Sequence, residues 1–173
     1  MKKSIIFLFA FCIIAFACSK DESLLQDEDL NVLTELKSKK LKTKTLSIKR
    51  SWGTMEMIFM DSPCSPDSYQ FVINGQGNAN LLGRFTVRNE VCFLPGEDGQ
   101  IIPQSAWLGF LTAANGDEIH TMLDFTWEGE GYYYIIIDGT GKFDGATGYI
   151  IMTGVTDYET WTYELKGEGE ITY

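Results

Sequence analysis

From Thr45 onward, hydrophobic and polar side chains alternate with a period of two, as they do in half-buried β-strands. The clearest run contains Phe85, Val87, Val91 and Phe93, which alternate with charged and polar neighbours. No stretch of this part of the chain keeps the 3.6-residue period of an amphipathic helix for ten residues. The pattern therefore predicts an all-β domain.

Short turn sequences rich in glycine, such as Asn115-Gly116-Asp117, separate the alternating runs. Eight antiparallel strands joined by such turns suit a closed barrel, because closure removes the exposed edges of an open sheet. The sequence thus predicts an eight-stranded antiparallel β-barrel, and a two-sheet sandwich is the alternative on pattern alone. The expected strands lie at roughly 47–60, 69–78, 82–93, 104–113, 118–127, 132–138, 146–155 and 160–172.

The run 132–137 is apolar on both faces. Tyr132 and Tyr134 would share one face, and Tyr133 and Ile135 the other. Strands that are apolar on both faces are covered on both faces. The outer face of this strand therefore needs a cover, which the N-terminal segment or a second subunit would provide.

The beginning of the chain follows a different pattern. Lys2 and Lys3 precede an apolar stretch over residues 5–17, and Ala15-Phe16-Ala17 places small residues just before Cys18. A charged start, a short apolar core and a small-residue cleavage site are typical of a secretory signal peptide. Thirteen apolar residues are too few for a transmembrane helix, which needs about 20. We expect a signal peptide at 1–17, a tether at 18–46 and the barrel domain at 47–173.

A cysteine at the first mature position resembles a bacterial lipoprotein signal, in which the thiol is acylated. The following Ser19-Lys20-Asp21-Glu22 resembles the surface-export signal of lipoproteins from the Bacteroidetes. These resemblances imply a membrane anchor at Cys18 and an outer-membrane location with the domain on the cell surface. Display on the periplasmic face and secretion with an incidental cysteine are the alternatives.

Charge is distributed unevenly along the chain, whose formal net charge is −10. From Ser51 to the end, four Lys/Arg stand against eighteen Asp/Glu. An anionic domain of this kind is repelled by nucleic acid and by anionic lipid. Binding of nucleic acid by the folded part is therefore excluded, and solubility is the simplest reason for the charge.

Two of the four cysteines remain in the mature domain once Cys12 and Cys18 are set aside. An exported protein reaches compartments that permit disulfides, so Cys64 and Cys92 are predicted to pair, with free buried thiols as the alternative. Closing this loop would contribute about 3–4 kcal/mol by the chain-entropy argument. One histidine and no close-spaced cysteine pair predict no metal site, and no motif indicates a cofactor.

The most specific motif is Asp138-Gly-Thr-Gly-Lys-Phe-Asp-Gly-Ala-Thr-Gly148. It resembles the Gly-Thr-Gly-Arg-Phe-x-Gly-Ala-x-Gly signature of the barrel shared by allene oxide cyclases and dirigent proteins. Glycines allow the left-handed, close-packed backbone of a tight strand crossing, and no helix follows that would make this a phosphate loop. The residues assigned to this structural role are Gly139, Gly141, Phe143, Gly145, Ala146 and Gly148, with Phe143 plugging the barrel end and Ala146 letting strands approach.

The resemblance implies an eight-stranded barrel, an interior site for a small molecule and, because the related plant proteins are trimers, a homo-oligomer. No catalytic residue of either family maps onto this sequence. His120 and Asp124, four apart on one predicted strand face, would form a His–carboxylate pair able to do acid–base chemistry, but an ordinary solvent-facing strand is the preferred explanation.

The function expected from these features is non-enzymatic. The domain would bind a small apolar or aromatic ligand in the barrel, or serve as a module of a surface assembly. The alternatives are a cyclase- or isomerase-like enzyme that uses the barrel interior, and a structural envelope protein with a filled barrel.

Overall fold

The structure is a computed structural model that describes residues 41–59, 63–64, 67–97 and 101–173. Its elements are nine β-strands and one short 3₁₀ helix. They are β1 (Thr43–Ile58), β2 (Tyr69–Ala79), β3 (Gly83–Pro95), β4 (Ile101–Pro103), β5 (Leu108–Ala113), β6 (Glu118–Leu123), β7 (Tyr132–Gly139), η2 (Gly141–Phe143), β8 (Thr147–Asp157) and β9 (Thr162–Thr172).

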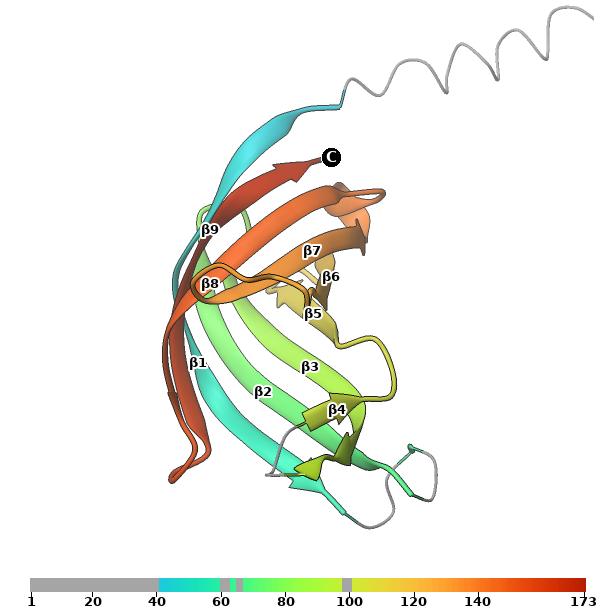
Figure 1. Cartoon of the computed structure of the whole chain (residues 1–173). Coiled ribbons are helices and arrows are strands. Elements are labelled where there is room, and N and C mark those ends of the chain that lie inside the picture. Colours follow the sequence, from blue (N-terminus) through green and yellow to red (C-terminus); the bar gives the residue numbers. More distant parts are fainter. Residues whose placement is uncertain (1–40, 60–62, 65–66, 98–100) are drawn as a thin grey trace, which may run out of the picture. The chain divides into compact units, whose positions relative to one another are not determined.

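The strands form one closed antiparallel barrel (Figure 1). Each strand pairs with the next one along the chain, except that β3 pairs with β5, and β9 returns to pair with β1. The eight strands of the barrel are β1, β2, β3, β5, β6, β7, β8 and β9, and the short β4 pairs only with the end of β3. The prediction of an eight-stranded antiparallel barrel is confirmed, and the sandwich alternative is excluded.

Three strand boundaries differ from the predictions by four residues, each for a local reason. β1 begins at Thr43, because its first residues pair with the end of β9 as far as Thr172. The strand predicted at 104–113 begins only at Leu108, since the hydroxyl of Ser105 accepts the Cys92 N–H at 3.0 Å in place of a ladder bond. The strand predicted at 118–127 stops at Leu123, because the next residue, Asp124, starts a turn in which its carboxylate accepts the Thr126 backbone N–H.

One end of the barrel is closed by a packed core. Phe143 and Ala146 are fully buried there, and the Phe143 ring packs edge-on against Tyr173 at 5.1 Å between centroids. Gly141 and Gly145 adopt positive φ angles of 60° and 71°, which glycine tolerates without strain. The structure therefore places the 138–148 motif in a tight crossing from β7 to β8 with Phe143 inside the barrel end.

A second hydrophobic cluster lies toward the other end, where β1, β2 and β3 extend beyond the shorter strands (Figure 1). Its buried members come from β1, β2, β3 and β9, and large aromatic side chains dominate it. They are Met55, Phe71, Val91, Phe93 and Tyr163, with Trp107 and Trp161 packed against them.

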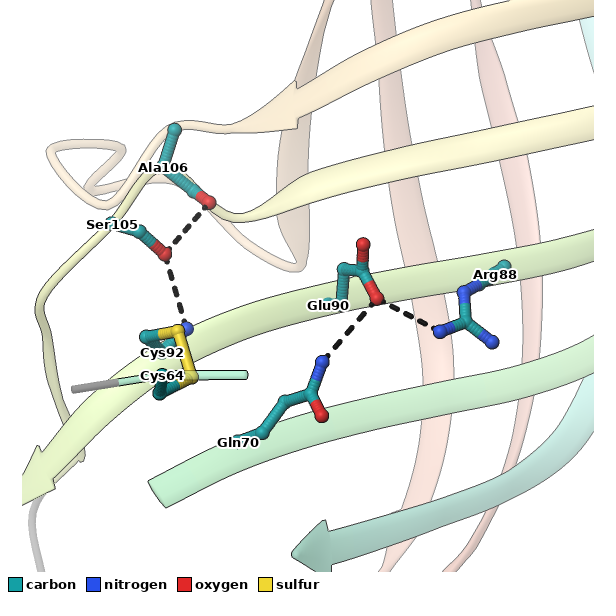
Figure 2. Close-up of a disulfide and its surroundings, with 7 residues drawn as sticks. All are labelled: Cys64, Gln70, Arg88, Glu90, Cys92, Ser105 and Ala106. Atoms are coloured by element: carbon teal, nitrogen blue, oxygen red, sulfur yellow. Dashed lines mark hydrogen bonds and ion pairs between the residues drawn. A yellow bond between two sulfur atoms is a disulfide. The ribbon is translucent and has the colours of Figure 1, made fainter. Parts of the chain in front are cut away.

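A disulfide ties the segment before β2 to the outside of the barrel. Cys64 and Cys92 are joined with their Cα atoms 5.6 Å apart (Figure 2). Beside the bond, Glu90 accepts hydrogen bonds from Arg88 at 3.0 Å and from Gln70 at 3.4 Å. The bond thus fixes the outer surface of β3 near its end and takes no part in the barrel interior.

Candidate functional site

The barrel is not filled along its whole length. A cavity of about 320 Å³ lies between the closed-end core and the second cluster. This volume falls within the range of small-molecule sites, and its wall is mostly apolar, as in such sites. The wall includes Ile48, Met55, Phe71, Val87, Leu111, Ile150 and Met152.

Aromatic side chains on two loops surround the mouth of the cavity. Phe125, Trp127 and Tyr132 come from the β6–β7 connection and the start of β7, and Tyr158 comes from the β8–β9 turn. All four line the cavity and are also exposed to solvent, Tyr158 by 62%. The cavity therefore opens at the end opposite the 138–148 motif, through an aromatic rim.

Polar side chains in the middle of the wall form hydrogen bonds with their neighbours. The Asn89 side-chain amide donates to the Tyr134 hydroxyl at 3.3 Å, and the Thr121 hydroxyl donates to the Gly109 carbonyl at 3.2 Å. Burial raises the pKa of Tyr134 far above its ordinary value, so its phenol stays neutral at any physiological pH. These residues give the middle of the cavity a neutral polar patch.

Two further polar atoms of the wall have no partner. The indole Nε1 of Trp107 and the hydroxyl of Tyr163 are buried, and neither makes a hydrogen bond with any described residue. Burial raises the pKa of Tyr163, and the nearby Ser51 hydroxyl opposes that rise without reaching hydrogen-bond geometry. Buried polar groups are normally satisfied, so these two atoms, which belong to residues of the cavity wall, are exceptions.

Among the described residues that line the cavity, a single carboxylate carries a charge. Asp124 lies at the mouth, and its Oδ1 accepts hydrogen bonds from the backbone N–H of Thr126 at 2.8 Å and from its hydroxyl at 2.7 Å. These bonds lower the pKa of Asp124, which keeps it ionised at neutral pH. Among the residues that the structure describes, no Lys, Arg or His lines the cavity.

His120 and Asp124 do not form the acid–base pair that the sequence left open as an alternative. His120 packs against Phe110 with centroids 5.1 Å apart, and its Nε2 lies 2.9 Å from Glu118 Oε2. Neither His120 nor Glu118 lines the cavity, whereas Asp124 does. The period-two rule failed because β6 ends at Leu123, so Asp124 belongs to a turn and not to the strand face.

The other predicted residues lie away from the cavity. The glycines of the motif, Phe143 and Ala146 close the opposite end, and Cys64 and Cys92 are on the outside of the barrel. Cys18 lies outside the described residues. The outer face of β7, for which a cover was expected, is covered in part by its own chain, because Tyr133 stacks between Trp127 at 4.8 Å and Tyr149 at 5.5 Å.

The orphan groups could not be identified from sequence. Tyr163 was recognised only as a member of an alternating strand, and Trp107 fell inside a predicted strand that in the structure begins only at Leu108. Alternation assigns a side chain to a face, but it does not show which polar atoms find partners across the barrel. The one available signal was the density of aromatic residues at both ends of the 104–127 region.

Comparisons with family models, with curated proteins and with solved structures find no match to this chain. In the part of the chain that the structure describes, no helix has the length and apolar character needed to cross a membrane. The same residues contain no cluster of His, Cys, Asp or Glu arranged to hold a metal ion. Among the described residues, the cavity is therefore the feature that bears on function.

Proposed function

We propose that this protein binds one small, mainly apolar molecule inside its barrel while a lipid on Cys18 anchors it to the outer membrane at the cell surface. The observation that carries the proposal is the cavity of about 320 Å³ with an aromatic mouth and two unsatisfied polar atoms in its wall. A protein interior is normally close-packed, so an open space of this size supports a role in binding a ligand. The exposed rim gives a ligand a route into it.

Binding fits the wall chemistry better than catalysis does. The ionisable groups that line the cavity are the Asp124 carboxylate at the mouth and a set of tyrosines. Burial raises the pKa of Tyr134 and Tyr163, which makes them hydrogen-bond donors and poor general bases at neutral pH. A cyclase-like activity, as the resemblance to allene oxide cyclases implies, would have to depend on such donors alone.

The anchor is supported by sequence and not by the fold. Residues 1–40 lie outside the described residues, and the signal around Cys18 is the sole basis for this half of the proposal. The resemblance of the 138–148 motif to the allene oxide cyclase and dirigent barrel agrees with interior binding, and we propose it as the relationship of this domain.

The proposal is tested by filling the cavity. Val87 lines it from β3, whereas its neighbour Thr86 points outward and is exposed. The neutral fluorescent probe N-phenyl-1-naphthylamine should bind the purified mature protein with 1:1 stoichiometry, and Val87→Trp should weaken that binding at least about tenfold because the indole occupies the ligand space.

Thr86→Trp is the matched control, because it adds the same side chain to the outer face, and it should bind the probe as the native protein does. Circular dichroism and the melting temperature show that both variants are folded. Equal probe binding by the two variants, or saturation with many probes per chain, would contradict binding inside the barrel.

A further inference from the structure

We infer that the ligand is an uncharged apolar molecule with an oxygen acceptor, such as a ketone or an ester, and that Trp107 donates a hydrogen bond to that oxygen. This inference rests on the proposed binding function and adds the chemical class of the ligand. It comes from the polar atoms and charges of the cavity wall.

The unpaired Trp107 indole N–H requires a hydrogen-bond acceptor. An indole N–H can only donate, so the Trp107 Nε1 requires a ligand atom with a lone pair. The Tyr163 hydroxyl is also unpaired, and because it stays protonated it can donate as well. Both atoms are covered by protein atoms in this structure, so the Trp107 indole has to turn toward the cavity for a ligand oxygen to reach its N–H.

The surroundings of Trp107 fix where that oxygen would lie. The indole ring packs edge-on against Phe71 at 5.3 Å between centroids and lies 5.7 Å from the ring of Phe125. Phe71 belongs to the buried cluster and Phe125 to the exposed rim. Trp107 therefore stands where the mouth meets the interior, and the rest of the ligand would extend among apolar side chains.

The charges of the wall argue against an anionic ligand. A carboxylate would meet no Lys, Arg or His among the described lining residues, and it would approach the ionised Asp124 at the mouth. The domain around it carries eighteen acidic against four basic residues from Ser51 onward. Burial of an unpaired charge is costly, so free fatty acids and other carboxylates should be rejected.

An ammonium group is a poor match for a different reason. It has three donors and no acceptor, so it cannot satisfy the Trp107 N–H. Asp124, a carboxylate at the mouth, still has its Oδ2 for a cation, but a cation there would leave the Trp107 N–H without an acceptor. The Trp107 donor therefore argues against an ammonium and the charge of the wall against an anion, which together favour a neutral acceptor.

Four naphthalenes of nearly equal size test the inference by calorimetry on the purified mature protein. They are 2-acetylnaphthalene, 2-ethylnaphthalene, 2-naphthoate and 2-naphthylmethylammonium. The ketone should bind about three- to tenfold more tightly than the hydrocarbon, as one buried hydrogen bond allows. The naphthoate should bind at least about tenfold more weakly than the ketone, because its charge would be buried without a partner.

Two tryptophan variants separate the hydrogen bond from general packing. Trp107→Phe should abolish the preference for the ketone over the hydrocarbon and leave the affinity for the hydrocarbon within about twofold. Trp161→Phe is the control, because Trp161 packs against the same cluster but does not line the cavity. In nitrogen-15 NMR spectra, the indole N–H resonance that Trp107→Phe removes should shift with the ketone more than with the hydrocarbon.

Each outcome decides a separate point. If the naphthoate or the ammonium compound binds as tightly as the ketone, or if Trp107→Phe keeps the preference for the ketone, the inference is overturned while binding in the barrel stands. If none of the four compounds binds, both the inference and the proposed function are overturned.

Discussion

Inside the barrel, glycines on one strand make room for large side chains from another. A Cβ atom at Gly75 would overlap the hydroxyl of Tyr163 and lie 2.5 Å from the carbonyl oxygen of Trp52. At Gly77, it would overlap the ring of Phe85. The Gly75-Gln-Gly77 sequence on β2 therefore shapes the cavity wall, because it allows Tyr163 to lie flat across the neighbouring strand.

We predict that Gly75→Ala lowers the free energy of unfolding by about 1–3 kcal/mol, because the added methyl overpacks a rigid wall. Thermal or urea unfolding measures the change. Gln76→Ala, on the exposed side of the same strand, should stay within about 0.5 kcal/mol. Adding Tyr163→Phe to Gly75→Ala should recover part of the loss, and strictly additive effects would show that the two residues do not meet.

The tight crossing between β7 and β8 shows what glycine contributes to an element. Gly145 has a φ of 71° with open space where a Cβ would be, whereas a Cβ at Gly148, whose φ is 145°, would overlap the backbone of Glu170 on β9. Gly145 therefore serves backbone conformation alone. Gly148 serves both conformation and the close approach of two strands.

These two positions give a prediction at the scale of the element. Gly145→Ala should cost about 1–2 kcal/mol, the penalty of a left-handed conformation for a residue with a Cβ. Gly148→Ala should cost at least about 3 kcal/mol, because neither backbone can move aside within the sheet. Equal melting temperatures for the two variants would refute the assigned close approach.

Strand β6 shows that alternation of residue types can predict where a strand begins and still fail to predict where it ends. The pattern correctly indicated a strand starting at Glu118, but the predicted strand continued to Trp127 because the alternation of residue types continues that far. The strand ends where the Asp124 carboxylate binds the Thr126 backbone N–H and starts a turn. A side chain that can bond to its own backbone competes with the ladder, and residue type alone does not show which interaction prevails.

At the scale of the whole molecule, the two ends of the barrel differ. The described chain enters at the closed end, where Lys42 and Tyr173 exchange backbone hydrogen bonds and Phe143 is buried. The loops at the other end carry the exposed aromatic rim of the cavity. The described chain therefore begins at the end of the barrel opposite the mouth.

The proposed anchor gives a prediction for the complete protein in its own cells. Mass spectrometry of the membrane-extracted protein should show an acylated Cys18 at the mature N-terminus, and Cys18→Ser should release the protein from the membrane fraction. Cys12→Ser, inside the proposed signal peptide, is the control and should not change the location. An unmodified, freely soluble mature protein would contradict the lipid anchor.

The sequence by itself determined the all-β class and most strand positions, and it favoured a closed barrel over a sandwich, because these follow from period-two alternation and from glycine-rich turns. It also indicated the disulfide that the structure contains between Cys64 and Cys92. The strands and turns depend on residues that are near one another in the chain, and the disulfide depends on the oxidising conditions of the compartment that an exported protein reaches.

The tertiary structure alone decided where the barrel is hollow and which polar atoms are left without partners. Trp107 and Tyr163 come from strands and connections far apart in the chain, and their shared wall exists only after closure. Whether opposing side chains meet or leave a space depends on the summed volumes of residues from all eight strands, including the inward glycines. That sum is a property of the closed barrel, so no local pattern in the sequence could show it.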